Sequence, residues 1–532
     1  MNILDEIVES CGKLVREEKD NIKQIHLTLL SKDTKNPQNT RVLAPSGEGK
    51  TYLVLKCASF HPQENIITLV KATPQSFKYS LSSKRVVENG SGNWQDYDDA
   101  ITPLEEELSK TKDKGKQKQL TAAIRELRDS ACDLVEFTGK VIILVDDQSY
   151  EFFESLKATL SHDLENMKSF SVNKTKSGTM KGQKFLFRGF PAVIYCSAKD
   201  EQKRDTTNEI GTRFNTISLN ASSKKYREML KLEGLLASLP KFIRDDVIIS
   251  DEELDQTRQK ILEIIANIKK SDEIINPYGE SLALLFPDDA GFRTRQLKIL
   301  NSNIEVITLA NYAQNPKCIK DGDTIPISTR RDIEDACNLT KEQKEIQAYK
   351  IKYFNKHIKP AIKEHGKEKE LVTGTTKCLT VSEFVDVLSK KKKPVIADRQ
   401  RLQETILIPC VEHGFLEKFP DPDNKSRDVY AITEQFLDND ANVESTLINT
   451  STLDDSCVKL FVKKYLEQRF NQEELELVDS DGQNITPVEL IDILCKIDAQ
   501  TPKNRHKIGS NEASMSNENE ILPLPITKEV QN

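Results

Sequence analysis

The residues with the clearest chemical signature lie between positions 41 and 58. A short β-prone run enters a loop rich in Gly, Pro and Ser that ends in Gly-Lys-Thr, and an apolar-periodic helix follows. The two glycines of the loop let backbone N–H groups turn toward phosphate oxygens, and the helix N-terminus adds positive potential. In such a loop the lysine reaches the β- and γ-phosphates and the threonine holds Mg²⁺. The stretch therefore predicts a site for ATP and Mg²⁺ formed by Pro45, Ser46, Gly47, Glu48, Gly49, Lys50 and Thr51.

The loop departs from the G-x-x-x-x-G-K-[ST] pattern at one position, because Ala44 stands where the first glycine is expected. Alanine fits at this position if its φ angle is negative. The alternative is a solvated glycine-rich turn before a helix, with no part in phosphate binding.

A second candidate is the run from Lys140 to Asp147, in which consecutive aliphatic residues end in two aspartates. Such a run predicts a strand buried on both faces, as in a parallel sheet covered by helices. Open α/β sheets bind ligands at the carboxyl ends of their strands. We therefore assign Asp146 to Mg²⁺ and Asp147 to the attacking water. Taken alone, the pair is equally typical of a cap on the next helix.

Basic residues gather in a stretch with the pattern of a β-hairpin. Alternating Phe, Leu and Val residues flank a glycine-containing turn, which predicts a hairpin over residues 168–190. Its lysines would bind nucleic-acid phosphates without selecting a sequence. The alternative is a solvated hairpin with no partner. The candidate contact residues are Lys174, Lys176, Lys181 and Lys184.

Two more strands are predicted downstream. Residues 191–197 form a buried apolar run that ends in the hydroxyl of Ser197, and residues 216–219 form the next, preceded by Asn208 to Phe214. Taken in order, the phosphate loop, the Asp-Asp strand, the basic hairpin, the Ser197 strand and the Glu-x-x-x-Arg segment resemble the AAA+ ATPases. More narrowly, the chain resembles the branch with a β-hairpin before the sensor-1 strand. That branch includes superfamily 3 and MCM-type helicases and related phage or plasmid helicase-primase proteins.

The resemblance covers roughly residues 35–310 and implies a fold and further roles. It implies an α/β P-loop sheet with strand order 5-1-4-3-2, in which Ser197 is the sensor-1 residue between the two anchor motifs. Arg213 matches the arginine finger, which acts on the nucleotide of the neighbouring subunit. A finger supplied in this way requires a ring or filament, so we predict a homo-oligomer in the form of a hexamer. The alternative for Arg213 is a surface salt bridge to Glu209.

A helical lid is expected after the core, and in the family such a lid supplies a second sensor arginine to the phosphates. Arg293 or Arg295 would match this sensor, although a capping or salt-bridge role fits the loose motif equally well.

Two helices, at 381–388 and 399–413, precede a predicted two-stranded hairpin at 414–432. This order resembles a winged-helix domain, a common C-terminal partner of DNA-handling AAA+ modules. Basic side chains around it suit the backbone of duplex DNA. The alternative is a winged helix used for protein packing. The candidate contact residues are Arg399, Arg401, Lys425 and Arg427.

The whole chain is expected to divide as follows: 1–34, an N-terminal helix and linker; 35–225, the ATPase core with a helical insertion at 80–135; 226–320, the lid; 321–375, a helical connector; 376–436, the winged helix; 437–499, an acidic helical region; 500–532, a disordered tail.

Composition limits the compartment and the class of partner. Charged residues make up 30% of the chain and the formal net charge is −7, so any contact with nucleic acid must come from local basic patches. The ten cysteines are scattered singly, as expected for reduced cytosolic thiols. No signal peptide and no run of transmembrane length is evident. We therefore expect a cytoplasmic protein without a membrane partner.

These patterns favour an ATP- and Mg²⁺-dependent helicase-type motor that acts on DNA in replication or mobile-element maintenance. Single-stranded DNA would pass through a channel and duplex DNA would contact the winged helix. The main alternative is a DNA-bound initiator or regulator switch with slow ATP hydrolysis, which the shorter Asp147 at the base position favours. An ATPase that remodels protein partners is a third class. No primase-like catalytic motif is evident.

Overall fold

The computed structural model describes most of the chain; the described residues are 3–87, 94–162, 166–174, 180–198, 213–271, 273–286, 293–343, 348–371, 374–390, 398–412, 414–437, 444–446, 450, 453 and 455–495. The chain divides into two compact units, Met1–Cys495 and Lys496–Asn532, and the second unit, with the predicted disordered tail, lies outside the described residues.

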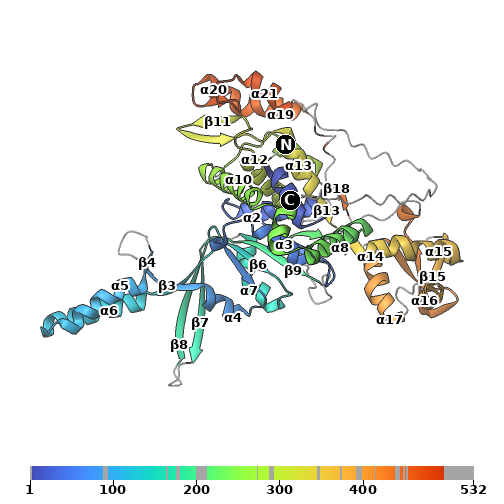
Figure 1. Ribbon diagram of the computed structural model, residues 1–532, viewed down its shortest axis with the longest axis horizontal. Coiled ribbons are helices and arrows are strands. Elements are labelled where there is room, and N and C mark those ends of the chain that lie inside the picture. Colours follow the sequence, from blue (N-terminus) through green and yellow to red (C-terminus); the bar gives the residue numbers. More distant parts are fainter. Residues whose placement is uncertain are drawn as a thin grey trace, which may run out of the picture. The chain divides into compact units, whose positions relative to one another are not determined.

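The central element is a five-stranded parallel sheet with the order β10-β1-β9-β6-β2. Its three inner strands are buried along their whole length, as expected for a parallel sheet with helices on both faces, although β6 alone is entirely aliphatic. The predicted mixed α/β fold with a parallel sheet and many helices is confirmed (Figure 1). The strands are β1 (Asn39–Leu43), β2 (Ile66–Leu69), β6 (Val141–Leu144), β9 (Ala192–Ser197) and β10 (Asn215–Ser218).

The N-terminal segment forms two helices, α1 (Ile3–Leu14) and α2 (Lys19–Ser31), where a single helix followed by a linker was predicted over residues 1–34. The break lies at Glu17, whose φ of 60° is left-handed. The next residue, Glu18, turns into the interior and forms a 2.6 Å ion pair with Lys225. The tertiary contact, which hydrophobic periodicity does not reveal, therefore divides the helix.

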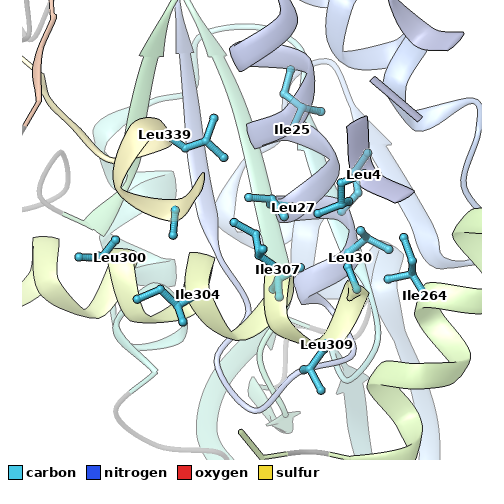
Figure 2. Packing of buried hydrophobic residues seen from close by; sticks show 14 of the residues in the cluster. Leu4, Ile25, Leu27, Leu30, Ile264, Leu300, Ile304, Ile307, Leu309 and Leu339 are labelled. Atoms are coloured by element: carbon cyan, nitrogen blue, oxygen red, sulfur yellow. The ribbon is translucent and has the colours of Figure 1, made fainter. Parts of the chain in front are cut away.

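Five helices follow the sheet strands in the region of the predicted lid: α8 (Ser223–Ser238), α9 (Lys241–Ile248), α10 (Asp251–Lys270), α11 (Gly279–Leu285) and α12 (Arg293–Ala310). Ser250 caps α10, and three acidic residues in its first turn complement the helix dipole. Side chains of α10 and α12 join those of α1 and α2 in one large core, in which Ile264, Leu300, Ile304, Ile307 and Leu309 lie near Leu4, Ile25, Leu27 and Leu30 (Figure 2).

The insertion and the hairpin build a second five-stranded sheet, with the order β4-β3-β5-β8-β7. The predicted insertion is helical only in its middle, where α5 (Tyr97–Lys110) and α6 (Lys114–Ser130) are joined through the ion pairs Lys116–Glu107 and Arg128–Glu105. The two ends of the insertion form strands, because these segments pair with one another in the second sheet. The strands are β3 (Ser82–Val87), β4 (Trp94–Asp96) and β5 (Cys132–Glu136). The hairpin consists of β7 (Asn166–Lys174) and β8 (Met180–Arg188).

The connector predicted as helical over 321–375 contains strands at both ends. Asp321 and Gly322 have φ angles of 53° and 92° and turn β11 (Lys317–Lys320) into β12 (Asp323–Pro326). An Asp-Gly turn between alternating residues is a hairpin signal that the sequence does contain. Between the strands lies α13 (Arg330–Leu339), which begins with a capping box.

The acidic C-terminal region adds a strand to the hairpin of β11 and β12. β19 (Glu476–Val478) pairs with β11, so the third sheet has the order β12-β11-β19. Its helices are α19 (Ser456–Phe461), which continues through a π-helical turn (Val462–Glu467) into α20 (Gln468–Asn471), and α21 (Pro487–Cys495). Val458 of α19, Leu466 of the π-helical turn, and Leu490 and Leu494 of α21 belong to the large core.

Residues 348–436 have a separate hydrophobic core. A four-stranded sheet, β14-β15-β17-β16, packs with α14 (Ala348–Tyr353), α15 (Lys359–His365), α16 (Val381–Ser389) and the helical run that begins with α17 (Arg399–Leu402). The core includes Ile351, Phe354 and Ile362, so this module starts within the expected connector. The strands are β14 (Lys367–Leu371), β15 (Gly374–Thr380), β16 (Leu416–Asp421) and β17 (Asn424–Ile432).

Among the described helices, none combines the length and the apolar character that crossing a membrane requires.

Candidate nucleotide-binding site

The loop between β1 and α3 (Lys50–Ala58) has the backbone that its sequence predicts. Gly47 and Gly49 have φ angles of 87° and 88°, which L-residues rarely adopt. Ala44 is not among the described non-glycine residues with positive φ, so alanine is compatible with that position. Its N–H donates to the carbonyl of Ser197 at 3.2 Å, which joins the start of the loop to β9.

Lys50 lies at the first position of α3 and reaches back over the loop. Its ammonium donates to the carbonyl oxygens of Ala44 at 2.7 Å and Pro45 at 2.9 Å. Burial lowers the pKa of Lys50, while nearby negative groups, including Asp147 and Glu48, oppose that shift. The cation is therefore held beside the backbone of the predicted phosphate cradle.

Asp146 and Asp147 follow β6 at the carboxyl edge of the sheet, and the two carboxylates have different surroundings. Asp146 is exposed, whereas Asp147 is half-buried. The hydroxyl of Thr51 lies 3.5 Å from the carbonyl oxygen of Val145, the residue that precedes Asp146. Thr51 is thus close to the backbone from which the predicted Mg²⁺ ligand projects.

Asp147 is held by two hydroxyl groups from β9. Oδ1 of Asp147 accepts hydrogen bonds from Ser197 Oγ and Tyr195 OH, each at 2.8 Å. β9 lies between β1 and β6, so its end is flanked by the phosphate loop and the Asp-Asp pair. The structure therefore brings Ser197 and Asp147 together.

Sequence reasoning missed Tyr195. It lies two residues before Ser197 on the same strand, so both side chains point to the same face. That two-residue alternation was the signal available in the sequence. Burial raises the pKa of Tyr195, which keeps its hydroxyl a hydrogen-bond donor.

The first lid helix also contacts the loop, which the sequence did not indicate. Tyr226 OH on α8 donates to Glu48 Oε1 at 3.1 Å. A Cβ atom on Gly49 would lie 3.7 Å from Met229 Cε of the same helix. The loop is thus bordered by α8 as well as by the sheet.

Arg213 lies at the amino ends of the parallel strands, whereas these residues lie at their carboxyl ends. It precedes β10, which runs parallel to β1, whereas the phosphate loop follows β1. A strand of four residues spans about 13 Å. Arg213 Nε donates to Ser161 Oγ, at the end of α7 (Tyr150–Ser161), at 2.5 Å. The site within one chain therefore does not include Arg213. Glu209, its expected alternative partner, lies outside the described residues.

The two candidate second-sensor arginines lie in the first turn of α12. Arg293 Nη1 donates to Gln296 Oε1 at 3.0 Å, and Arg295 is exposed. A sensor role for either residue stays a prediction.

The predicted nucleic-acid contacts are described only in part. Lys184, on β8, is exposed and its Nζ lies 3.4 Å from the carbonyl oxygen of Asp129. Lys174 and Lys181 have their backbones in β7 and β8, while their side chains lie outside the described part of the structure, as does the whole of Lys176. In the module of residues 348–436, the exposed candidates are Arg399, Arg401 and Arg427; the side chain of Lys425 lies outside the described part.

The residues present fit a nucleoside triphosphate with a divalent cation. A Cβ atom on Gly47 would meet nothing within 4 Å, so the loop backbone faces open space. The nine-residue helix α3 begins at this loop and presents its N-terminal N–H groups there. The Thr51 hydroxyl and the Asp146 carboxylate supply the oxygen ligands that Mg²⁺ prefers.

No protein-family model matches the chain, and no curated protein matches it. Among solved structures, the crystal structure of a full-length MCM homolog from Methanopyrus kandleri is similar over 63% of this chain and 58% of that one, with 10% sequence identity and a TM-score of 0.30.

Proposed function

We propose that the chain is an ATP-hydrolysing AAA+ motor of the helicase type that acts on DNA as a homo-oligomer. The observation that carries the proposal is the group at the carboxyl edge of the sheet: the Lys50 loop and Asp147 on either side of Ser197. Further support comes from the strand order, because the five strands numbered along the chain follow the sequence 5-1-4-3-2. This is the order that the resemblance implies.

In this proposal each residue has a defined role. The loop N–H groups and Lys50 bind the phosphates. Thr51 and Asp146 hold Mg²⁺, which supplies charge neutralisation of the phosphates when bound. Asp147 orients the attacking water and accepts its proton, while Ser197 holds Asp147 and contacts the γ-phosphate.

The DNA part of the proposal rests on the hairpin of β7 and β8 and on the module of residues 348–436, which we propose to be a winged helix. The hairpin lysines would contact a single strand through its phosphates, and the exposed arginines of the module would contact duplex DNA. Contacts of this kind weaken as the salt concentration rises, because counterions are released on binding.

The decisive experiment is ATP hydrolysis with and without single-stranded DNA across a salt series. We expect DNA to stimulate hydrolysis at low salt, and we expect Lys50→Ala to lower turnover by about 100-fold or more, since it removes a charge that stabilises the transition state. Alanine at positions 174, 176, 181 and 184 should abolish stimulation. Alanine at the four lysines 112, 114, 116 and 118 of the insertion is the matched control.

The proposal fails if DNA leaves turnover unchanged and the hairpin variant binds DNA like the wild type. Slow turnover with stable binding to duplex DNA and no strand displacement would favour the alternative, a DNA-bound switch. Asp147 favours that alternative, because its side chain is one methylene shorter than that of a glutamate at the position of the catalytic base.

A further inference from the structure

Four side chains with soft or nitrogen donor atoms meet in the interior of the large core, behind the phosphate-loop helix. Cys11 comes from α1, His26 from α2, Cys57 from α3, and His61 follows α3. The first three are 0% exposed and His61 is 4% exposed. The proposed ATP chemistry uses none of them.

The spacing of the two thiols fits a shared metal ion. The Sγ atoms of Cys11 and Cys57 are 3.6 Å apart, and a ring nitrogen of His26 lies within 4.8 Å of both. A tetrahedral zinc ion with two Zn–S bonds of about 2.3 Å holds its sulfurs about 3.8 Å apart. A disulfide requires about 2.0 Å. At the observed separation the two thiols form a hydrogen bond, and the same separation matches two thiolates on one cation.

The histidines have the arrangement of a metal-bound imidazole and its supporting group. Nδ1 of His26 and Nε2 of His61 are 2.9 Å apart, a hydrogen bond that fixes the His26 ring. The second nitrogen, Nε2 of His26, is buried and has no hydrogen-bond partner among the described residues. Buried polar atoms without a partner are costly, and a metal ion would satisfy this one. Metal-binding histidines commonly use their other nitrogen in this way.

We propose that Cys11, His26 and Cys57 bind one thiophilic cation of the zinc class, and that His61 orients the His26 ring. Thiolate and imidazole ligands favour such an ion over Mg²⁺ or Ca²⁺. Binding would release the thiol protons to solvent and leave the fourth position to a small ligand such as water. The ion would join both N-terminal helices to the helix that begins at Lys50.

The test is the metal content of the full-length protein, purified under reducing conditions, dialysed against chelator and reloaded with zinc or cobalt(II). We expect one equivalent of zinc per chain and, with cobalt, the absorption of a thiolate-to-cobalt charge transfer. Cys57→Ser and His26→Gln should lose both signals. Cys337→Ser is the matched control, because Cys337 is equally buried in the same core, and it should keep them.

A second measurement keeps the inference testable if a variant fails to fold. In the wild-type protein, alkylation followed by mass spectrometry should find Cys11 and Cys57 protected with zinc and labelled after its removal, while the half-buried Cys132 is labelled equally in both states. A sub-stoichiometric metal content in the reduced protein would overturn the proposal. So would unchanged cobalt absorption in Cys57→Ser, or a Cys11–Cys57 disulfide that forms in preference to metal binding.

Discussion

At the scale of single residues, the carboxylate of Asp147 is the best-defined group of the candidate site. Two hydroxyl donors at 2.8 Å, from Tyr195 and Ser197, fix one of its oxygens. Hydrogen bonds to a charged acceptor contribute about 1.5–3 kcal/mol each. A carboxylate held in this way is suited to orienting a water molecule, which is the role we propose for it.

We expect Tyr195→Phe to lower the turnover number for ATP by about tenfold without weakening ATP binding, because 1.4 kcal/mol corresponds to a factor of ten. Ser197→Ala should have a larger effect, since it also removes the proposed phosphate contact. Tyr150→Phe is the control, because it deletes a similar 2.9 Å hydrogen bond to Glu154 on the surface. Wild-type turnover in Tyr195→Phe would contradict the role of Asp147.

Two neighbouring lysines on α8 have opposite environments. Lys225 and Glu18 have side chains that are 3% and 2% exposed and form a 2.6 Å ion pair, and burial raises the pKa of Glu18. Lys224 is 74% exposed and pairs with Glu17 at 3.0 Å. The buried pair links the turn between α1 and α2 to the first helix of the lid.

Lys225→Met should lower the free energy of unfolding by about 3–5 kcal/mol, because it leaves the buried Glu18 carboxylate without its cationic partner. The matched variant Lys224→Met should cost less than about 1 kcal/mol, as exposed pairs do. Urea denaturation measures both. Equal denaturation midpoints for the two variants would show that the buried pair does not stabilise the fold.

At the scale of elements, the base of the hairpin is packed against the sheet that holds the nucleotide site. The hairpin residues Phe185 and Phe187 belong to one buried cluster with Phe77, Phe153 and Tyr195. The ring centroids of Phe153 and Tyr195 are 4.9 Å apart. A residue that binds Asp147 and a residue on β8 thus share one packed core.

The capping box at the start of α16 makes the stability of its module depend on pH. Burial opposes ionisation of Glu383, but bonds from Lys367 and Thr380 outweigh it and lower the pKa of Glu383 from 4.5. Because the pKa of Glu383 is lower in the folded state, its carboxylate stabilises the fold above pH 4.5. This stabilisation is lost as the pH falls through the pKa that Glu383 has in the folded state.

Glu383→Gln should therefore lower the free energy of unfolding by about 1 kcal/mol at neutral pH, the usual contribution of a cap. This difference should shrink toward zero in acid, where the wild-type carboxyl is protonated as well. Urea midpoints of the full chain at neutral and acidic pH test this. The exposed Glu404→Gln is the control, and a constant difference across pH would exclude the proposed mechanism.

At the scale of the whole molecule, the separation of Arg213 from the phosphate loop has a direct consequence. Arg213 precedes β10 and the phosphate loop follows the parallel strand β1, so they lie at opposite ends of the paired strands. We therefore propose that Arg213 acts on the nucleotide of another subunit, in which case a complete site would need two chains.

Mixing inactive variants tests this arrangement. Arg213→Ala and Lys50→Ala should each lack activity, and an equal mixture should regain about one quarter of it, because a site with both groups intact forms at that frequency in a randomly mixed ring. Mixing Lys50→Ala with Asp147→Asn should regain nothing, since both residues act within one chain. Activity of Arg213→Ala alone at the wild-type level would refute the role in trans.

The local features of the site could be predicted from the sequence because each depends on a short run of residues. Gly47, Gly49 and Lys50 specify the loop backbone and its charge within a few positions, and the buried run before Asp146 specifies a strand and its end. The Asp321-Gly322 turn was equally local, although the sequence-based prediction passed over it.

Periodicity and turn residues act over a few positions, so the amino-acid sequence predicts where strands end in chemically useful residues. Which of those ends meet depends on the packing of the whole chain. Tyr195 reaches Asp147, Lys225 reaches Glu18, and β19 pairs with β11 across more than a hundred residues of chain. Contacts of this kind depend on how elements pack, and no short window of sequence contains both partners.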